Sequence, residues 1–304
     1  MKLREIANER DEAAHSESLP FLCTISPGLV LCKDGSLLAG FEYTGVDIDN
    51  SDDFVLEQCL GEIQRAYQSL DERFYVWWSI DKRRDYSYPS SEFPNKASQR
   101  IDDLVKERYE RGEVFAIRYR FFLLYTGETG VFSYMDNVRR LVNDERRPLP
   151  MALVLGLSPN QMKTSSLMHD AKQMDSNIQM TEDAISRFTS LCTVMRFKRL
   201  TEWEMESTLV QQANITLPLD AKFEPPAGCL LDSFASLSDV NVGREVVAVS
   251  GPTRSAFVAN LNLKQYAAQN SPYLIEKLMT MPFEFRLTHV LKLMGQNEAR
   301  KELT

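Results

Sequence analysis

Leu29-Val-Leu-Cys-Lys-Asp-Gly-Ser-Leu-Leu-Ala-Gly-Phe-Glu-Tyr43 is the stretch that decides the fold class. At its centre, Asp34-Gly35 is a strong signal for a tight turn between two antiparallel strands. Apolar residues suited to strands stand on both sides of this dipeptide. The stretch therefore predicts a β-hairpin close to the start of the folded part of the chain.

Helices and strands alternate after this hairpin. A helix is expected from about 53 to 70, because apolar residues recur at steps of three and four and acidic residues at 51–53 can cap it. An aromatic strand at 74–80, a helix at 96–111 and a strand at 114–125 follow. This order predicts an α+β fold, with helices packed on one face of a mixed or antiparallel sheet.

The second half of the chain centres on one long helix. A strand at 151–157 and a turn precede it, and apolar residues from Leu167 to Met195 then recur at alternating steps of four and three. Thr201-x-x-Glu204 predicts the start of another helix, at 202–213. Residues 193–200 fit either a short strand or a continuation of the long helix. Strands at 245–250, 255–263 and 284–291, and a helix at 272–280, complete the prediction.

Three segments are expected to form the domain organisation. Residues 1–18 lack any apolar period and read as a mobile arm, 19–147 as a first α+β subdomain and 148–304 as a second. An extended connector rich in proline, glycine and serine is expected at about 218–242.

Composition limits the classes of function. With 304 residues, of which 43% are hydrophobic, the chain can bury a sizeable core. Its formal net charge of -8 argues against nucleic acid as a direct partner, since phosphate binding requires a basic surface. Five scattered cysteines, never spaced as C-x-x-C, predict neither a disulfide framework nor a zinc site and fit a reducing compartment. No apolar run approaches the roughly 20 residues of a spanning helix.

Motifs of catalysis and of cofactor binding are missing from the sequence. The segment Gly40–Gly45 has the glycine spacing of a P-loop but lacks the lysine and the hydroxyl residue that should follow. The sequence also lacks G-x-G-x-x-G, H-E-x-x-H and G-x-S-x-G patterns. Its three histidines lie far apart, so we predict no catalytic, cofactor-binding or metal-binding residue in this chain.

Two features are candidates for protein interaction. The first is a loop expected after the aromatic strand, where arginine donors and tyrosine rings combine in Arg83, Arg84, Tyr86 and Tyr88. A phosphate ligand, or a solvated loop without any partner, is the competing interpretation. The second is the helical seam, with the candidate residues Leu167, Met174, Ile178, Ile185 and Phe188. Such a seam can mediate self-association or can pack on the sheet of its own domain.

The hairpin, together with Leu19-Pro-Phe-Leu22 before it and Thr44-Gly-Val-Asp47 after it, resembles the opening hairpin of the VirB/TrbE/CagE ATPases of type IV secretion and conjugation. An aromatic strand that ends in arginines is similar to that family's N-terminal region in order and kind. So are two later stretches, Val249-Ser-Gly-Pro-Thr-Arg-Ser-Ala-Phe-Val-Ala-Asn-Leu-Asn-Leu263 and Ser271-Pro-Tyr-Leu-Ile-Glu-Lys-Leu-Met-Thr-Met-Pro-Phe-Glu-Phe285. The likeness covers most of the chain as a diffuse pattern without a catalytic signature.

The resemblance implies a docking and assembly module at the cytoplasmic face of a bacterial inner membrane. Such a module would bind inner-membrane and channel subunits of a type IV secretion system and order a homo-oligomer, with peripheral membrane contact possible. ATP and Mg²⁺ would then be bound only by a motor domain beyond this chain. Two other hypotheses remain open: a stand-alone self-associating scaffold, and an enzyme whose site is assembled from scattered residues near Cys229, His169 or His289.

Overall fold

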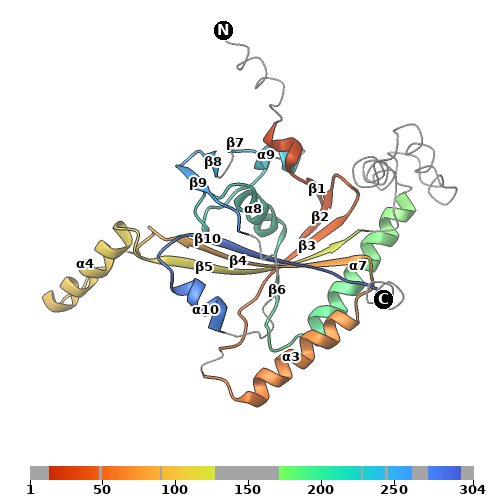
Figure 1. Cartoon of the computed structure of the whole chain (residues 1–304), viewed down its shortest axis with the longest axis horizontal. Helices are drawn as coiled ribbons and strands as arrows, with labels where there is room; N and C mark the ends of the chain where they lie inside the picture. Colours follow the sequence, from red (N-terminus) through yellow and green to blue (C-terminus); the bar gives the residue numbers. More distant parts are fainter. Residues whose placement is uncertain are drawn as a thin grey trace, which may run out of the picture. The chain divides into compact units, whose positions relative to one another are not determined.

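The computed structural model of this chain describes residues 14–47, 50–89, 91–126, 171–226, 229–243, 246–261 and 273–295. These residues form two compact units (Figure 1). The first unit takes its described residues from 1–19, 79–119 and 206–288, and the second from 20–78, 120–205 and 289–304. The predicted strand at 151–157 and the predicted subdomain boundary after residue 147 lie outside the described residues.

The predicted hairpin is present in the second unit. Its strands are β2 (Leu29–Cys32) and β3 (Leu37–Glu42), which pair antiparallel with Leu29 opposite Ala39. Gly35 occupies the turn with φ of 84°, a left-handed conformation that glycine adopts at low cost. Strand β1 (Phe21–Ser26), which the sequence analysis did not predict, adds to the outer edge of β2.

The hairpin belongs to a seven-stranded sheet with the order β1-β2-β3-β5-β4-β10. β3 pairs antiparallel with β5 (Phe115–Tyr125) from Leu37 opposite Tyr125 to Glu42 opposite Arg120. A two-residue strand, β6 (Lys198–Arg199), also pairs with β3, which answers the open question at 193–200 in favour of a short strand. The mixed α+β class with mainly antiparallel pairing is thereby confirmed.

Helices α3 (Asp53–Gln68) and α7 (Ala171–Leu191) lie side by side in the second unit (Figure 1). The predicted seam of α7 faces the core. Ile185 and Phe188 are buried there, and Phe188 stacks on Phe121 of β5 with ring centroids 4.8 Å apart. Met174 and Ile178 are half-buried against the same core, whereas Leu167 lies outside the described residues.

The seam therefore packs within its own unit, which is one of the two interpretations that the sequence left open. Self-association through the described seam residues is not supported, because the apolar groups that would drive it are already covered. The physical reason is that one helix stripe can be buried only once. It is buried here against an aromatic core built from β3, β4 and β5.

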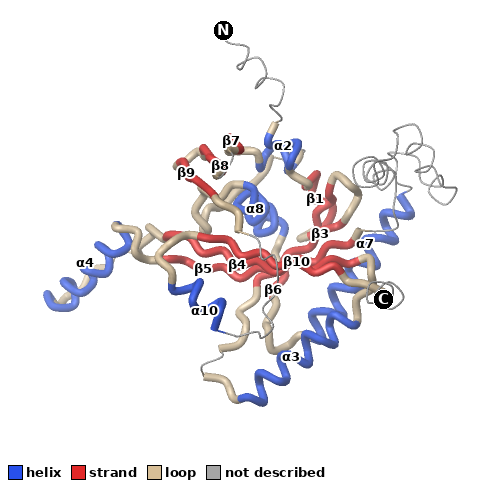
Figure 2. The backbone as a smooth tube through the Cα atoms, in the orientation of Figure 1, coloured by secondary structure: helices blue, strands red, loops and turns tan. Residues whose placement is uncertain are grey.

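The first unit contains a separate three-stranded antiparallel sheet, drawn as three short strands in Figure 2. β8 is its central strand. The elements assigned to this unit, in whole or in part, are α2 (His15–Ser18), α4 (Lys96–Glu110), α8 (Glu202–Ala213), α9 (Leu231–Ala235), β7 (Asp239–Val242), β8 (Val247–Ser250), β9 (Ser255–Val258) and α10 (Tyr273–Thr280). The long strands β4 (Phe74–Arg84), β5 and β10 (Phe285–Lys292) contribute residues to both units.

Asn214, at the end of α8, fixes the region that the sequence reads as a connector. Its side-chain amide donates to the carbonyl of Ala235 in α9, and its side-chain oxygen accepts a hydrogen bond from Ser238. Within 218–242 the structure thus contains one short helix and one short strand, α9 and β7. Neither is long enough to produce a periodic pattern in the sequence.

Candidate functional site

The basic segment that follows the aromatic strand is not a loop. Strand β4 continues through Asp81, Lys82 and Arg83 and ends at Arg84, so the expected loop at Arg83 and Arg84 is wrong. The side chains of Asp81, Lys82 and Arg83 are buried, although charged residues are rarely buried unless they are paired. Each of them finds a polar partner within the first unit, and alternation along the strand sends them to opposite faces of it.

Arg83 holds the C-terminal end of α8. Its guanidinium donates to the carbonyls of Gln211 at 3.1 Å and Asn214 at 3.3 Å, and also to that of Leu217. The last carbonyls of a helix have no partner within the helix and carry the negative end of its dipole, so a cation placed there stabilises them. Arg83 is therefore a structural residue of the unit's interior.

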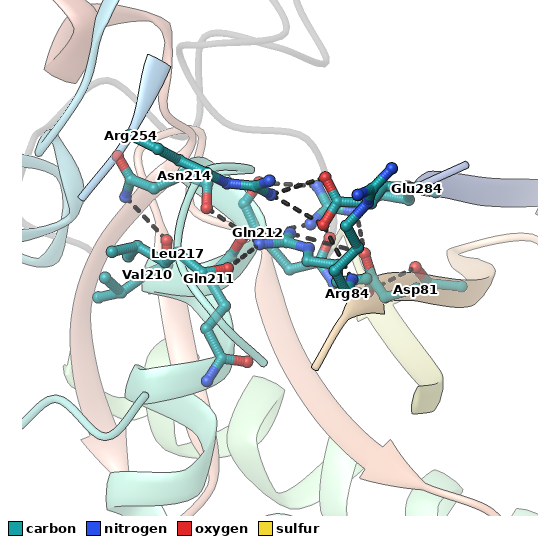
Figure 3. A network of polar contacts seen from close by, with 12 residues as sticks. Asp81, Arg84, Val210, Gln211, Gln212, Asn214, Leu217, Arg254 and Glu284 are labelled. Atoms are coloured by element: carbon teal, nitrogen blue, oxygen red, sulfur yellow. Dashed lines mark hydrogen bonds and ion pairs between the residues drawn. The ribbon is translucent and has the colours of Figure 1, made fainter. Parts of the chain in front are cut away.

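Asp81 supplies the negative charge on the same face of β4. Its carboxylate accepts from Arg286 of β10 at 2.6 Å and from the side chain of Gln212 at 2.8 Å, and it lies 3.8 Å from Arg83. Arg286 in turn donates to the carbonyls of Gln211 and Gln212. Figure 3 shows this closed network, in which every buried charge has hydrogen-bonding partners.

Lys82 holds a second helix end on the opposite face of β4. Its ammonium donates to the carbonyls of Met279 and Met281, where α10 ends, and lies 4.3 Å from the ring centroid of Phe115. The next residue but one, Arg84, donates its backbone N–H to Glu284, whose carboxylate also pairs with Arg254 at 2.8 Å. We name the residues Asp81, Lys82, Arg83 and Arg286 the charged clamp.

The two tyrosines after β4 have different surroundings. Tyr86 is exposed, as a contact residue would be. Tyr88 donates a hydrogen bond to Asp102 of α4, and its ring lies 5.2 Å from that of Tyr109. The hydrogen bond to Asp102 raises the pKa of the Tyr88 phenol to about 12. Tyr88 therefore attaches α4 to the preceding segment, and Tyr86 and the half-buried Arg84 are the accessible members of the predicted set.

A different surface, which the sequence analysis did not single out, carries exposed apolar side chains. Every residue of β7 is exposed, Val242 has an exposed fraction of 76% and Phe257 of β9 one of 81%. Leu261, three residues after β9, is 93% exposed. Since β8 is the central strand, β7 and β9 are both edges, and no described strand pairs with their outer sides. We name Val240, Val242, Phe257 and Leu261 the β7–β9 surface.

The residues proposed for a scattered enzyme site do not gather. Among the described residues, no group of three or more His, Cys, Asp or Glu side chains is placed to hold a metal ion. His289 is exposed on β10, Cys229 is half-buried, and His169 lies outside the described residues. Within the described part of the chain, no helix combines the length and the apolar character needed to cross a membrane.

Two family models match the chain. Residues 28–131 match the N-terminal domain of the type IV secretion system ATPase VirB4/TrbE, and residues 213–304 match the CagE, TrbE, VirB family, a component of the type IV transporter system. The chain belongs to the VirB/TrbE/CagE family. Both matched segments of this family member contribute to the charged clamp, since Arg83 comes from the first and Arg286 from the second.

Relatives of this VirB/TrbE/CagE chain are distant but extensive. The type IV secretion system protein virB4 of Bartonella quintana is 21% identical over 95% of this chain and 35% of its own length. The virB4 protein of Brucella suis is 18% identical over 99% of this chain and 34% of its own length. A probable conjugal transfer protein TrbE of Sinorhizobium fredii, known as the first of its parts, is 27% identical over 36% of this chain and 76% of its own length. The chain thus spans about a third of the virB4 relatives.

Proposed function

We propose that this chain is the N-terminal docking and assembly module of a type IV secretion ATPase. In this role it binds inner-membrane and channel subunits of the secretion system and orders the oligomer of the motor. Support comes from the match of residues 28–131 to a domain that is N-terminal in VirB4/TrbE ATPases. The family resemblance and the chain's one-third share of its virB4 relatives are consistent with a module of a larger protein.

The observation that carries the docking role is the β7–β9 surface. Exposed edge strands with apolar side chains are unusual in a protein that works alone, because an unpaired edge invites another strand to add to the sheet. Neither β7 nor β9 contains the lysine or proline that commonly protects such an edge. We propose that an extended, apolar segment of a channel subunit pairs with this edge.

The catalytic part of the proposal concerns residues outside this chain. ATP and Mg²⁺ would be bound by a motor portion, because the family carries the description of an ATPase while this sequence lacks a P-loop. The module would then work from the cytoplasmic face of the inner membrane and transmit conformational changes of the motor to the channel.

A capture experiment tests the docking role. The immobilised chain is incubated with individually purified inner-membrane and channel subunits, and bound protein is quantified. We expect Phe257→Asp to reduce capture by about tenfold or more, since a buried aromatic anchor dominates a contact of this kind. Ser255→Asp is the matched control, because the register places Ser255 two residues away on the same face of β9. Capture by neither wild type nor control would contradict the proposal, as would capture that Phe257→Asp leaves unchanged.

Arg84 and Tyr86 remain proposed contact residues. Tyr86→Ala removes an exposed ring without touching the charged clamp, so a selective loss of capture would assign it to the interface. Arg83→Ala is unsuitable for this purpose, because Arg83 is buried and its loss would disturb the unit itself.

A further inference from the structure

Helix α4 buries the wrong face. None of its residues is fully buried, and its half-buried side consists of Ser98, Gln99, Asp102, Asp103, Glu107 and Tyr109. The apolar residues Ile101, Leu104 and Val105 lie at helical spacing on the opposite, exposed side, with Ile101 at 64%. A helix of a globular protein normally turns its apolar stripe inward. In Figure 1, α4 also projects away from the other elements of its unit.

The exposed side of α4 is basic as well as apolar. Asp102 accepts a hydrogen bond from Tyr88, Asp103 one from Gln99, and Glu107 pairs with Arg111 at 2.9 Å. These interactions engage the acidic residues of the half-buried side. The exposed charged residues of the helix are Lys96, Arg100, Lys106, Arg108 and Glu110, a basic excess in a chain whose net charge is -8. The salt bridges of Lys106 and Arg108 are long and exposed, so they cost little to break.

Helix α3 offers the complementary surface. Phe54 is 74% exposed and Leu60 is 68% exposed, and Glu57 lies between them at a spacing of three residues in each direction. Asp53 is exposed beside them, in the first turn. Gly61, one turn after Glu57, has open space where a side chain would stand, which allows another helix to approach closely. The exposed side of α3 is thus apolar and acidic where that of α4 is apolar and basic.

We propose that α4 of one copy of this chain docks on α3 of a second copy. Leu104 and Ile101 would bury their side chains against Phe54 and Leu60, while Arg100 would pair with Glu57. The inference rests on the proposed assembly role and names the surfaces that would serve it. Such a contact is heterologous, since two different faces meet, and heterologous contacts build closed rings when the rotation between copies allows it.

A second copy fits both faces better than other occupants do. An anionic membrane surface would attract α4, but it would repel the acidic face of α3 and leave Phe54 and Leu60 exposed. Two α4 helices packed on each other would also leave α3 without a partner. Because a single helix–helix contact buries less than the roughly 1,200–2,000 Å² of stable complexes, we expect association in the micromolar range or weaker.

Charge reversal tests the pairing in the full 304-residue chain by sedimentation velocity over a range of concentrations. We expect Arg100→Glu alone and Glu57→Arg alone to weaken association by about tenfold, because each places like charges opposite one another. An equimolar mixture of the two variants should regain the wild-type association, since in each contact between unlike copies that joins the changed faces a glutamate again meets an arginine. Lys106→Glu, an equal charge change on another side of α4, should leave association unchanged.

Each alternative result overturns the proposal. A wild-type chain that stays monomeric at every concentration does so, as does a mixture that fails to recover. Loss with Arg100→Glu but none with Glu57→Arg would assign α4 to another partner, and binding of the monomer to phosphatidylglycerol vesicles would make that partner a membrane. The docking role is judged separately, because Arg100→Glu should still capture channel subunits through the β7–β9 surface.

Discussion

Helices α7 and α4 carry similar sequence patterns and have opposite fates. Both are amphipathic, with apolar residues repeated at steps of three and four. α7 buries Ile185 and Phe188 in the core of the second unit, whereas α4 leaves Ile101 and Leu104 exposed and turns its polar side inward. An amphipathic pattern therefore identifies a stripe that needs a cover, and it does not say whether the cover belongs to the same chain.

The largest effect is expected where the stripe is covered. Ile185→Asp places a carboxylate in a core position that is almost fully buried, and an unpaired buried charge costs more than a domain of this size can tolerate. We expect loss of the cooperative urea transition of the second unit, followed by circular dichroism. Ser186→Asp, the adjacent exposed position, is the control and should unfold like the wild type. A folded Ile185→Asp variant would show that α7 is not core.

A smaller loss is expected in the charged clamp, which holds the unit to which α4 belongs. Arg83→Ala leaves three carbonyls at the end of α8 without their donor and Asp81 with one cation fewer. We expect a destabilisation of about 3–5 kcal/mol, the usual cost of breaking a buried charged network. Arg84→Ala, whose side chain is only half-buried, should cost much less in the same urea titration. Equal losses would contradict the structural role of Arg83.

Glu62 of α3 anchors the segment that follows α7. Its carboxylate accepts from the backbone N–H of Val194 at 2.9 Å and from the hydroxyl of Thr193 at 3.0 Å. Burial acts to raise the pKa of Glu62, but these hydrogen bonds and one from Gln58 outweigh it and hold the pKa below its ordinary value. Glu62→Gln keeps the size and removes the charge, so we expect a loss of about 1–3 kcal/mol at neutral pH.

The pH dependence of this loss has a definite sign. Since the folded state lowers the pKa of Glu62, the carboxylate contributes stability above the unfolded-state pKa of about 4.3. That contribution disappears as the pH falls through the lower, folded-state pKa. The difference in urea stability between wild type and Glu62→Gln should therefore shrink below about pH 4. A constant difference down to about pH 2 would argue against an ionised Glu62.

The smallest effect on stability is expected for Leu104→Asp in α4. Because Leu104 is exposed and contacts no core, the change should alter the free energy of unfolding by no more than about 0.5 kcal/mol. A loss above about 2 kcal/mol would mean that the chain itself covers α4, which would end the comparison with α7.

Sequence reasoning succeeded where the deciding signal is local. Asp34-Gly35 specified the hairpin, and the spacing of apolar residues placed α4 and α8 within a residue or so of their observed bounds. It failed where the deciding partner is distant. Arg83 looked like a loop residue because the carbonyls that satisfy it belong to residues more than a hundred positions later in the chain. For the same reason no local pattern could reveal that α4 faces outward.

The short elements were missed for a different reason. α9 and β7 contain five and four residues, too few to repeat any period, and they stand among prolines and serines that favour a connector. The candidate contact residues divide along the same line. Tyr86 is exposed as expected, whereas Arg83 and Tyr88 are engaged in holding α8 and α4.

Hydrogen–deuterium exchange of the wild-type chain at several protein concentrations tests the central claim most directly. The account predicts that amides of α7 are protected at every concentration, while those of α4 and of the first half of α3 exchange fast in dilute protein and gain protection together as copies associate. If α4 is already as protected as α7 in dilute protein, or if concentration leaves α4 and α3 unchanged, the outward stripe is not an assembly surface and the account is wrong.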